Sequence, residues 1–181
     1  MLQIRRLSGK SDFLARGRRK SLLLLGIVLI SLTSKKSGSA AGSQPTDASP
    51  DIKSIKSRGL KILLVDDNTK FSKALSMVLK TKYAAHVEAR GSGEAGIEAV
   101  RGGKIYDLIM IDLLMPLGKD GLQTYRELAG MVGTGCRFAL MSARPDSKEW
   151  DEASRLGVPM LEKPILPGRL IALLNDCGGS D

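Results

Sequence analysis

The sequence predicts an α/β fold, a five-stranded parallel sheet that is doubly wound, with five helices covering its two faces. Short apolar segments of strand length alternate with amphipathic segments of helix length along residues 59–181. The apolar run at 108–111, inside the stretch YDLIMIDLLMP, contains no polar residue, which is typical of a strand buried on both faces. Because crossovers between parallel strands are right-handed, a doubly wound sheet is the most economical arrangement of these segments.

The pattern begins with an apolar strand at 61–65, KILLV, and Asn68 or Thr69 can cap the helix that follows it. Apolar side chains recur along this helix with the spacing of a helix that lies on a sheet. These side chains are Phe71, Ala74, Leu75, Val78 and Leu79.

The remaining elements alternate in the same way, each strand being followed by a helix. Pro116 closes the segment of the third strand, and Gly157 ends the fourth helix. The expected strands are 84–88, 108–111, 137–142 and one within 158–162, and the expected helices are about 93–100, 122–132, 150–156 and a last one from 167 that ends before Gly178.

The excess positive charge of the chain is confined to its first 58 residues. Residues 1–58 contain 12 Lys and Arg against 3 Asp and Glu, whereas residues 59–181 contain 16 of each. A neutral domain with few aromatic residues lacks the clustered cations and stacking surfaces that nucleic-acid binding requires. We therefore divide the chain into a basic tail, 1–58, and a domain, 59–181, and expect no direct nucleic-acid contact by the domain.

The tail combines a basic start, a short apolar segment at 22–32 and a linker at 35–50 that is rich in Ser, Gly and Ala. Eleven helical residues span about 16 Å, well short of a ~30 Å hydrocarbon core, so we expect no transmembrane helix there. Three interpretations stay open: a cleaved export or transit signal, a basic anchor that contacts a membrane, and upstream sequence included through a wrongly assigned start. A tail without a role in the chemistry of the domain is the simplest alternative.

Two patterns that suggest ligand sites have structural interpretations here. Gly91, Gly93 and Gly96 form a GxGxxG pattern, but it follows the second strand, whereas dinucleotide-binding glycines follow the first. We interpret it as the turn that starts a helix. The two cysteines do not have metal-ligand spacing, and we expect Cys136 to be a buried small hydrophobe and Cys177 a free thiol at the end of the chain.

Polar side chains stand at the ends of four predicted strands. Asp66 and Asp67 follow the first strand, Asp112 the third and Ser142 the fourth, and Lys163 lies just past the fifth. In the flavodoxin-like strand order 2-1-3-4-5, these four strands are contiguous, so the side chains meet in one pocket. Clustered carboxylates require a cation, and a site of oxygen ligands suits Mg²⁺.

This set of side chains matches the needs of phosphoryl transfer. A bound Mg²⁺ and Lys163 neutralise the equatorial oxygens, Ser142 donates to one of them, and Asp112 attacks in line. The product is an aspartyl phosphate.

Four motifs carry a resemblance to the response regulator receiver domain of two-component signalling. They occur in the order of that family, and the resemblance covers about residues 59–181. The motifs are VDD at 65–67, IDLLMP at 111–116, MSA at 141–143 and EKP at 162–164.

The resemblance implies a role for each matching residue. Asp112 is the phosphoacceptor, and Mg²⁺ is held by Asp66, Asp67, Asp112 and the backbone carbonyl of Leu114. Ser142 is the switch hydroxyl, and Lys163 contacts the phosphoryl group and precedes a proline that is often cis.

The resemblance also implies partners. The phosphoryl group comes from a histidine kinase or a histidine phosphotransfer protein, so the domain is expected in the cytoplasm. A downstream protein is contacted through the face made by the fourth helix, the fifth strand and the fifth helix. The protein catalyses only its own phosphorylation and dephosphorylation, so it is not expected to be an enzyme in the ordinary sense. Little chain remains after Lys163, so we expect a stand-alone receiver without an output domain.

Two positions differ from the family pattern. The turn that is usually MPxMDG reads MPLGKDG here, which is one residue longer. The aromatic residue that usually reports the switch on the fifth strand is replaced by Met160.

Two other functions compete with a phosphorylated receiver. A phosphatase of the haloacid dehalogenase type also starts from an aspartate at a strand end, but it requires a carboxylate where Asn68 stands. A receiver-shaped interaction module that is never phosphorylated is the other alternative.

Overall fold

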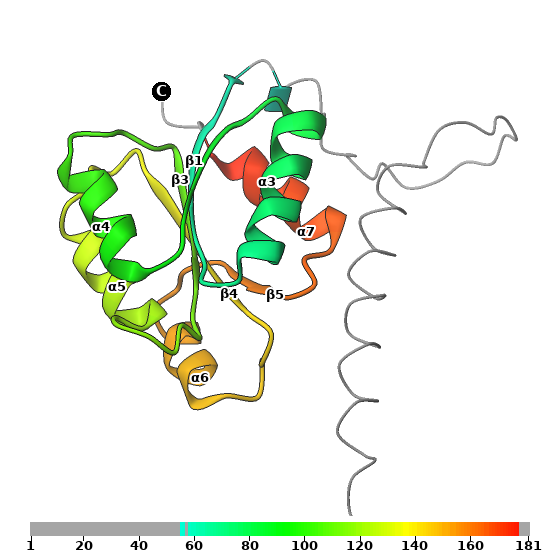
Figure 1. The fold of residues 1–181 in the computed structure, drawn as a ribbon. Helices are drawn as coiled ribbons and strands as arrows, with labels where there is room; N and C mark the ends of the chain where they lie inside the picture. The colour runs from blue at the N-terminus through cyan, green and yellow to red at the C-terminus, as the bar shows by residue number, and fades with distance from the viewer. Residues whose placement is uncertain (1–54, 57, 178–181) are drawn as a thin grey trace, which may run out of the picture. The chain divides into compact units, whose positions relative to one another are not determined.

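A computed structural model describes residues 55–56 and 58–177, so the predictions for the rest of the tail lie outside the described residues. Within the described part, no helix is both long and apolar enough to cross a membrane. Strands and helices alternate as predicted (Figure 1). They are β1 Lys61–Val65, α3 Thr69–Tyr83, β2 His86–Arg90, α4 Gly93–Arg101, β3 Leu108–Asp112, α5 Gly121–Ala129, β4 Arg137–Ser142, α6 Lys148–Ser154, β5 Met160–Glu162 and α7 Pro167–Asp176.

The five strands form one parallel sheet in the order β2-β1-β3-β4-β5, which confirms the predicted topology. Val65 at the end of β1 is in register with Ile111 of β3, and Asp112 is in register with Met141 of β4. The carboxyl ends of the three central strands therefore lie at the same edge of the sheet.

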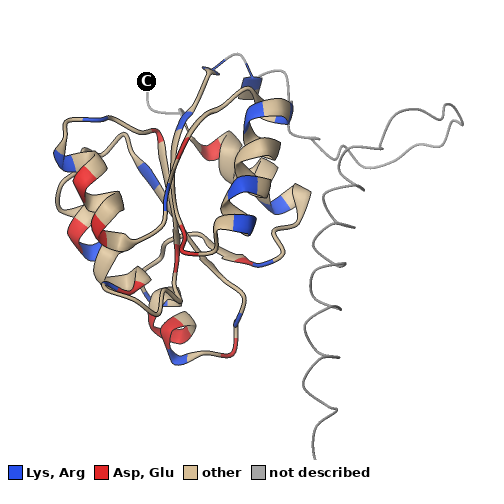
Figure 2. Ribbon diagram, in the orientation of Figure 1, with Lys and Arg blue, Asp and Glu red and all other residues tan. Residues whose placement is uncertain are grey.

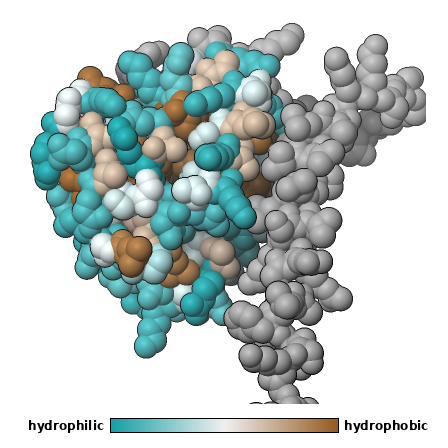
Figure 3. All heavy atoms as spheres, viewed as in Figure 1, coloured by the Kyte–Doolittle hydropathy of each residue, from teal (hydrophilic) through white to brown (hydrophobic). Residues whose placement is uncertain are grey.

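Two apolar layers enclose the sheet. Helices α3 and α7 cover one face, and α4, α5 and α6 cover the other (Figure 1). All five residues of β3 are buried, which explains why this strand is uniformly apolar up to Asp112. On the face drawn in Figure 3, the hydrophobic side chains of the described residues lie in small separate patches.

Packing of the α/β unit begins before the predicted boundary at residue 59. Ile55 is fully buried in the apolar layer that contains α3 and α7. The Arg58 guanidinium donates to the carbonyl oxygens of Leu174 at 3.0 Å and Asn175 at 3.3 Å, and also to that of Cys177. These are the carbonyl groups that the end of a helix leaves without intrahelical partners, so Arg58 caps α7.

The second strand lies two residues later than predicted, at 86–90 and not at 84–88. Helix α3 continues through Tyr83 and ends at Ala84, which adopts a left-handed conformation with φ of 55°. The N–H of Ala85 then bonds the carbonyl of Leu79 at 3.1 Å. Ala84 and Ala85 therefore belong to the end of the helix, and the strand starts at His86.

Two helices end earlier than predicted because apolar spacing continues into the turns that end them. Helix α5 ends at Ala129, and Val132 packs on the same apolar layer from the turn, where its N–H bonds the carbonyl of Leu128 at 3.1 Å. Helix α6 similarly ends at Ser154, before Leu156.

Candidate functional site

The strand ends bring the predicted site residues to one edge of the sheet. Asp66 directly follows β1, Asp112 ends β3, and Ser142 ends β4. The N–H of Lys163 donates to the carbonyl of Ser142 at 2.7 Å, which continues the pairing of β4 with β5 and fixes the lysine beside the other three. Figure 2 shows acidic ribbon segments where β1 and β3 end.

Three carboxylates form the centre of this site. Asp66, Asp67 and Asp112 each offer an oxygen atom, and these atoms lie within 4.8 Å of one another. Asp66 and Asp112 are buried, whereas Asp67 is exposed. The structure thus brings together the three acidic residues that the sequence predicted as metal ligands.

Lys163 is the cation nearest to the buried carboxylates. Its Nζ lies 2.7 Å from Oδ2 of Asp66 and 2.9 Å from Oδ2 of Asp112. The lysine side chain is only 10% exposed, so these ion pairs are little screened by water. The peptide bond between Lys163 and Pro164 is cis, as the family resemblance implied.

Phe71 is a site residue that the sequence reasoning missed. Nζ of Lys163 lies 4.4 Å from the centroid of the Phe71 ring, within the range of a cation–π contact. In the sequence, Phe71 fits the apolar stripe of α3, and nothing local distinguishes it. Its position three residues after the helix cap Asn68, and so close to the end of β1, was the available signal.

Burial dominates the electrostatics of the two inner carboxylates. Desolvation raises the pKa of Asp66 and of Asp112 above the ordinary value, although the charge of Lys163 and its hydrogen bond act in the opposite direction. For Asp66 the N–H of Asn68, which donates to Oδ1 at 2.8 Å, also favours the charged form. One lysine shared by two buried carboxylates therefore leaves negative charge without compensation.

The donor set fits a hard divalent cation. Oδ1 of Asp112 is buried and has no hydrogen-bond partner among the described residues. A buried carboxylate oxygen without a partner is costly unless a cation or water completes it. Together with Asp66 and Asp67, it provides the oxygen ligands that Mg²⁺ prefers.

The roles of Ser142 as the switch hydroxyl and of the Leu114 carbonyl as a metal ligand stay predictions. Ser142 is fully buried, and its Oγ accepts the N–H of Arg144 at 3.0 Å. Its hydroxyl also lies 3.4 Å from the Arg144 carbonyl, at the long limit of a hydrogen bond. The N–H of Leu114 favours the charged form of Asp112.

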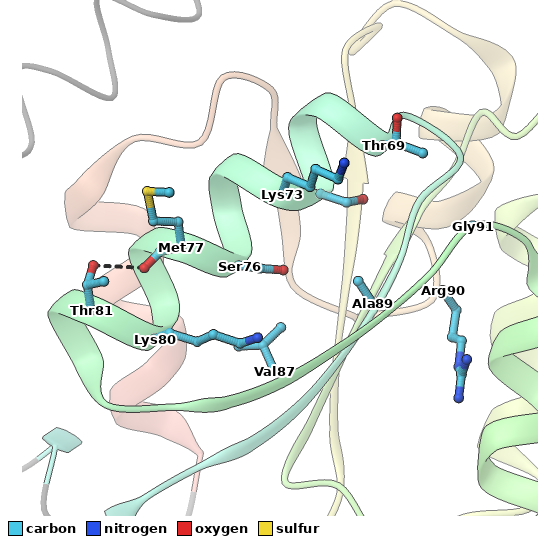
Figure 4. Close-up of a pocket in the computed structure, with 11 residues that line it drawn as sticks. Thr69, Lys73, Ser76, Met77, Lys80, Thr81, Val87, Ala89, Arg90 and Gly91 are labelled. Atoms are coloured by element: carbon cyan, nitrogen blue, oxygen red, sulfur yellow. Dashed lines mark hydrogen bonds between the residues drawn. The ribbon is translucent and has the colours of Figure 1, made fainter.

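A groove of about 670 Å³ between α3 and β2 is separate from the carboxylate cluster. Lys73, Ser76, Lys80 and Val87 are among its lining residues, and the side chain of Arg90 points away from it (Figure 4). No carboxylate, histidine or cysteine lines this groove, so it does not offer side-chain ligands for a second metal site.

Both cysteines are free thiols, which confirms the prediction for Cys177, whereas Cys136 is less buried than predicted. Cys177 is fully buried in the layer of α3 and α7, whereas Cys136 is only partly buried. Burial raises the pKa of the Cys136 thiol to about 11 and that of the Cys177 thiol to about 12. The position of Cys177 near the C-terminus did not indicate its burial, which follows from the packing of its side chain in the layer of α3 and α7.

The GxGxxG pattern starts a helix, as predicted. Ser92 caps α4, and its Oγ accepts the N–H of Ala95 at 3.2 Å. The helix then begins at Gly93.

Comparisons with known proteins agree with this site. The family model of the response regulator receiver domain matches residues 62–175. The two-component response regulator ARR22 of Arabidopsis thaliana is 27% identical over 122 residues, which cover 67% of this chain and 85% of ARR22. The transcriptional regulatory protein ResD of Bacillus subtilis (strain 168) is 41% identical over 71 residues, 38% of this chain, and the match spans only 27% of ResD.

A solved structure gives the same result for the fold. A response regulator receiver protein from Pseudomonas putida superposes with a TM-score of 0.57 at 26% identity, covering 64% of this chain and 95% of that protein. The matched family model spans more than half of the chain and includes the three carboxylates, the hydroxyl and the lysine at the strand ends. The chain therefore belongs to the response regulator receiver domain family of two-component signalling.

Proposed function

We propose that Asp112 accepts a phosphoryl group in a Mg²⁺-dependent reaction. The observation that carries this proposal is the state of its carboxylate: Oδ2 is paired with Lys163, whereas Oδ1 is buried without a hydrogen-bond partner among the described residues. An oxygen of this kind is available to a metal ion or to phosphorus. The donor is a histidine kinase or a histidine phosphotransfer protein, as expected for a receiver domain.

Each residue of the site has a defined task in this reaction. A carboxylate oxygen of Asp112 forms a bond to phosphorus while the bond from phosphorus to the donor nitrogen breaks, and the electron pair of that bond stays on the nitrogen. Lys163, already held between two carboxylates, pairs with a phosphoryl oxygen. The hydroxyl of Ser142 leaves its 3.4 Å contact with Arg144 and donates to another phosphoryl oxygen.

The metal site belongs to the same proposal. Asp66, Asp67, Asp112 and the backbone carbonyl of Leu114 would hold the ion. When bound, Mg²⁺ supplies positive charge that offsets the charge of the three carboxylates and of the phosphoryl group.

Phosphorylation changes the conformation of one surface of the domain, and this change is the signal to downstream proteins. Ser142 ends β4, which is paired with β5, so a movement of its side chain reaches the face formed by α6, β5 and α7. Met160 of β5 packs against the layer of α4, α5 and α6 and takes the place of the usual aromatic residue. A downstream protein binds this face, and the domain, supplied by a kinase, works in the cytoplasm and modifies only itself.

Phosphorylation of the purified protein tests the proposal. Incubation with Mg²⁺ and a small acyl phosphate should add one phosphoryl group, and Asp112→Asn should abolish the addition, as followed by intact mass spectrometry. Asp176→Asn is the matched control, because Asp176 is an exposed aspartate at the end of α7 and should leave labelling intact.

Three outcomes would contradict the assignment. Label retained in Asp112→Asn would show that another residue is the acceptor. A partner that binds equally well with and without the phosphoryl group would favour an interaction module that is not regulated by phosphorylation. Turnover of phosphomonoesters would instead indicate a phosphatase, for which the described site offers no specific support.

A further inference from the structure

The loop that follows the phosphoacceptor is the segment in which this chain departs from the family pattern. It covers residues 113–120 between β3 and α5 and carries the extra residue. Its two ends are fixed: the Leu113 N–H donates to the Met141 carbonyl at 2.8 Å, and the Gly121 N–H donates to the Leu113 carbonyl at 3.2 Å. Its middle is on the surface, where Leu117 is 81% exposed.

Two side chains from other elements contact Lys119 in this loop, but only one of them bonds its backbone. Nζ of Lys119 lies 2.9 Å from Oε2 of Glu127 in α5, an ion pair of the side chain alone. Oε1 of Glu94, the second residue of α4, accepts the N–H of Lys119 at 2.7 Å. A Cβ atom on Gly118 would lie 2.6 Å from that oxygen and 2.8 Å from Oε2, and Gly118 has a φ of 78°. The loop therefore follows the Glu94 carboxylate closely, and only a glycine permits the approach at residue 118.

The glycine pattern at the start of α4 explains how Glu94 reaches the loop. A Cβ atom on Gly93 would lie 2.1 Å from Oγ1 of Thr124 and 3.1 Å from Cβ of Lys119. A Cβ atom on Gly96 would lie 2.7 Å from a methyl group of Val65. These two glycines let α4 pack directly on β1, α5 and the loop, which gives the GxGxxG pattern a purpose in the receiver domain.

We propose that Glu94 is a positioning residue that clamps the loop at 113–120 and thereby holds the backbone next to Asp112 in place for the metal ion. This inference rests on the proposed function, because it concerns Leu114, whose carbonyl is the predicted metal ligand. Four residues lie between Leu114 and Lys119 along the chain, and Leu117 and Gly118 among them are exposed. Without the clamp, the loop is held by the buried side chain of Met115, by the cap of α5 at Asp120 and by the half-exposed ion pair of Lys119 with Glu127, and none of these bonds the backbone between Leu114 and Lys119.

The position of Glu94 allows its effect on the loop to be separated from an effect on the fold. Glu94 is exposed and belongs to neither apolar layer. Its interactions with the first turn of α4 lie at the surface, so removing it should change global stability only slightly. Groups that hold the ligands of a metal site change metal affinity by one to two powers of ten when they are removed. A change in Mg²⁺ affinity without a change in stability is therefore the signature of the clamp.

Three variants of the full chain test the inference. Glu94→Ala removes the acceptor, Glu94→Gln keeps an oxygen that accepts the Lys119 N–H, and Glu98→Ala is the matched control. Glu98 is also an exposed glutamate of α4, but it pairs with Arg101 and not with the loop. Mg²⁺ affinity is measured by titration calorimetry, order of the loop by ¹⁵N relaxation of the Leu117 and Lys119 amides, and stability by urea unfolding.

We expect Glu94→Ala to weaken Mg²⁺ binding about tenfold and to increase the motion of both amides, with the urea midpoint unchanged. Glu94→Gln should restore most of the affinity, and Glu98→Ala should behave as the wild type. Wild-type affinity and unchanged amide relaxation in Glu94→Ala would overturn the inference.

Failure of the proposed function gives a different result. A wild-type protein that binds no Mg²⁺ would contradict the metal-dependent reaction. The clamp is then judged by relaxation alone: increased motion of the two amides in Glu94→Ala supports it, and unchanged motion overturns it.

Discussion

Burial and charge act against each other at the residues of the site. Asp66 and Asp112 are held beside Lys163 at hydrogen-bond distance, yet desolvation still raises the pKa of both. Keeping both buried carboxylates ionised therefore costs electrostatic free energy, which Lys163 lowers and a bound metal ion would lower further. A cost of this kind at a site is expected where function, and not stability, determines the residues.

Cys177 gives a prediction for pH dependence at the same scale. Its folded-state pKa of about 12 lies above the ordinary value of about 8.5 for a thiol. Between these values the unfolded thiol has lost its proton and the folded thiol has kept it. Its stabilising contribution is thus fully present below pH ~8.5 and is lost as the pH rises towards 12.

We therefore expect the wild type to lose about 1 to 2 kcal/mol more stability between pH 8 and pH 10 than Cys177→Ala does. Urea unfolding at the two pH values measures the difference. Cys177→Ala is the reference for the wild type, because the two proteins share all other titrating groups. Parallel losses in the two proteins would show that the Cys177 thiol is not shielded from ionisation.

At the scale of secondary-structure elements, a helix that packs closely on a strand leaves room only for glycine at the point of contact. Helix α4 lies on β1 at Gly96, where a methyl group would lie 2.7 Å from a methyl of Val65. Valine has little rotational freedom to move away. Gly168 in the first turn of α7 is different, because no atom lies within 4 Å of its Cβ position.

The same substitution should consequently have opposite effects at these two glycines. Gly96→Ala should destabilise the domain by about 1–3 kcal/mol through overpacking. Gly168→Ala should stabilise it by about 0.5–1 kcal/mol, because alanine loses less backbone entropy in a helix. Thermal or urea unfolding of both variants is the measurement. Equal effects at the two sites would contradict the packing that the structure gives for α4.

At the scale of the whole molecule, residues that precede the first strand complete the core. Ile55 is fully buried among residues of α3 and α7, and Arg58 caps α7 from across the domain. The basic tail is thus connected to the α/β unit through a segment that belongs to the packed structure.

Ile55→Ala should therefore destabilise the protein by about 2–4 kcal/mol, as expected for a buried isoleucine. Ile105→Ala is the matched control, because Ile105 is 79% exposed and should change stability by less than about 0.5 kcal/mol. Denaturant unfolding of the full chain compares them. An effect of Ile55→Ala as small as that of the control would place Ile55 outside the cooperative core.

The sequence by itself determined the parts of the fold that depend on local pattern. The strands at 61–65 and 137–142 were predicted with their observed ends, because each is a compact apolar run bounded by charged or polar residues. The meeting of Asp66, Asp67 and Asp112 was predicted by placing the strand ends in the flavodoxin-like order 2-1-3-4-5, which the structure confirms. These features need no knowledge of how particular side chains pack.

The tertiary structure alone decided the features that join distant parts of the chain. The contact of Phe71 with Lys163, the clamp of Glu94 on Lys119 and the burial of Ile55 link residues that no local pattern connects. The second strand starts later than predicted for a related reason. The two alanines at 84–85 fit a strand as well as a helix end, and the structure places Ala84 in the left-handed conformation that ends α3. Periodicity reports which face of an element is apolar, whereas only packing decides which atoms meet across it.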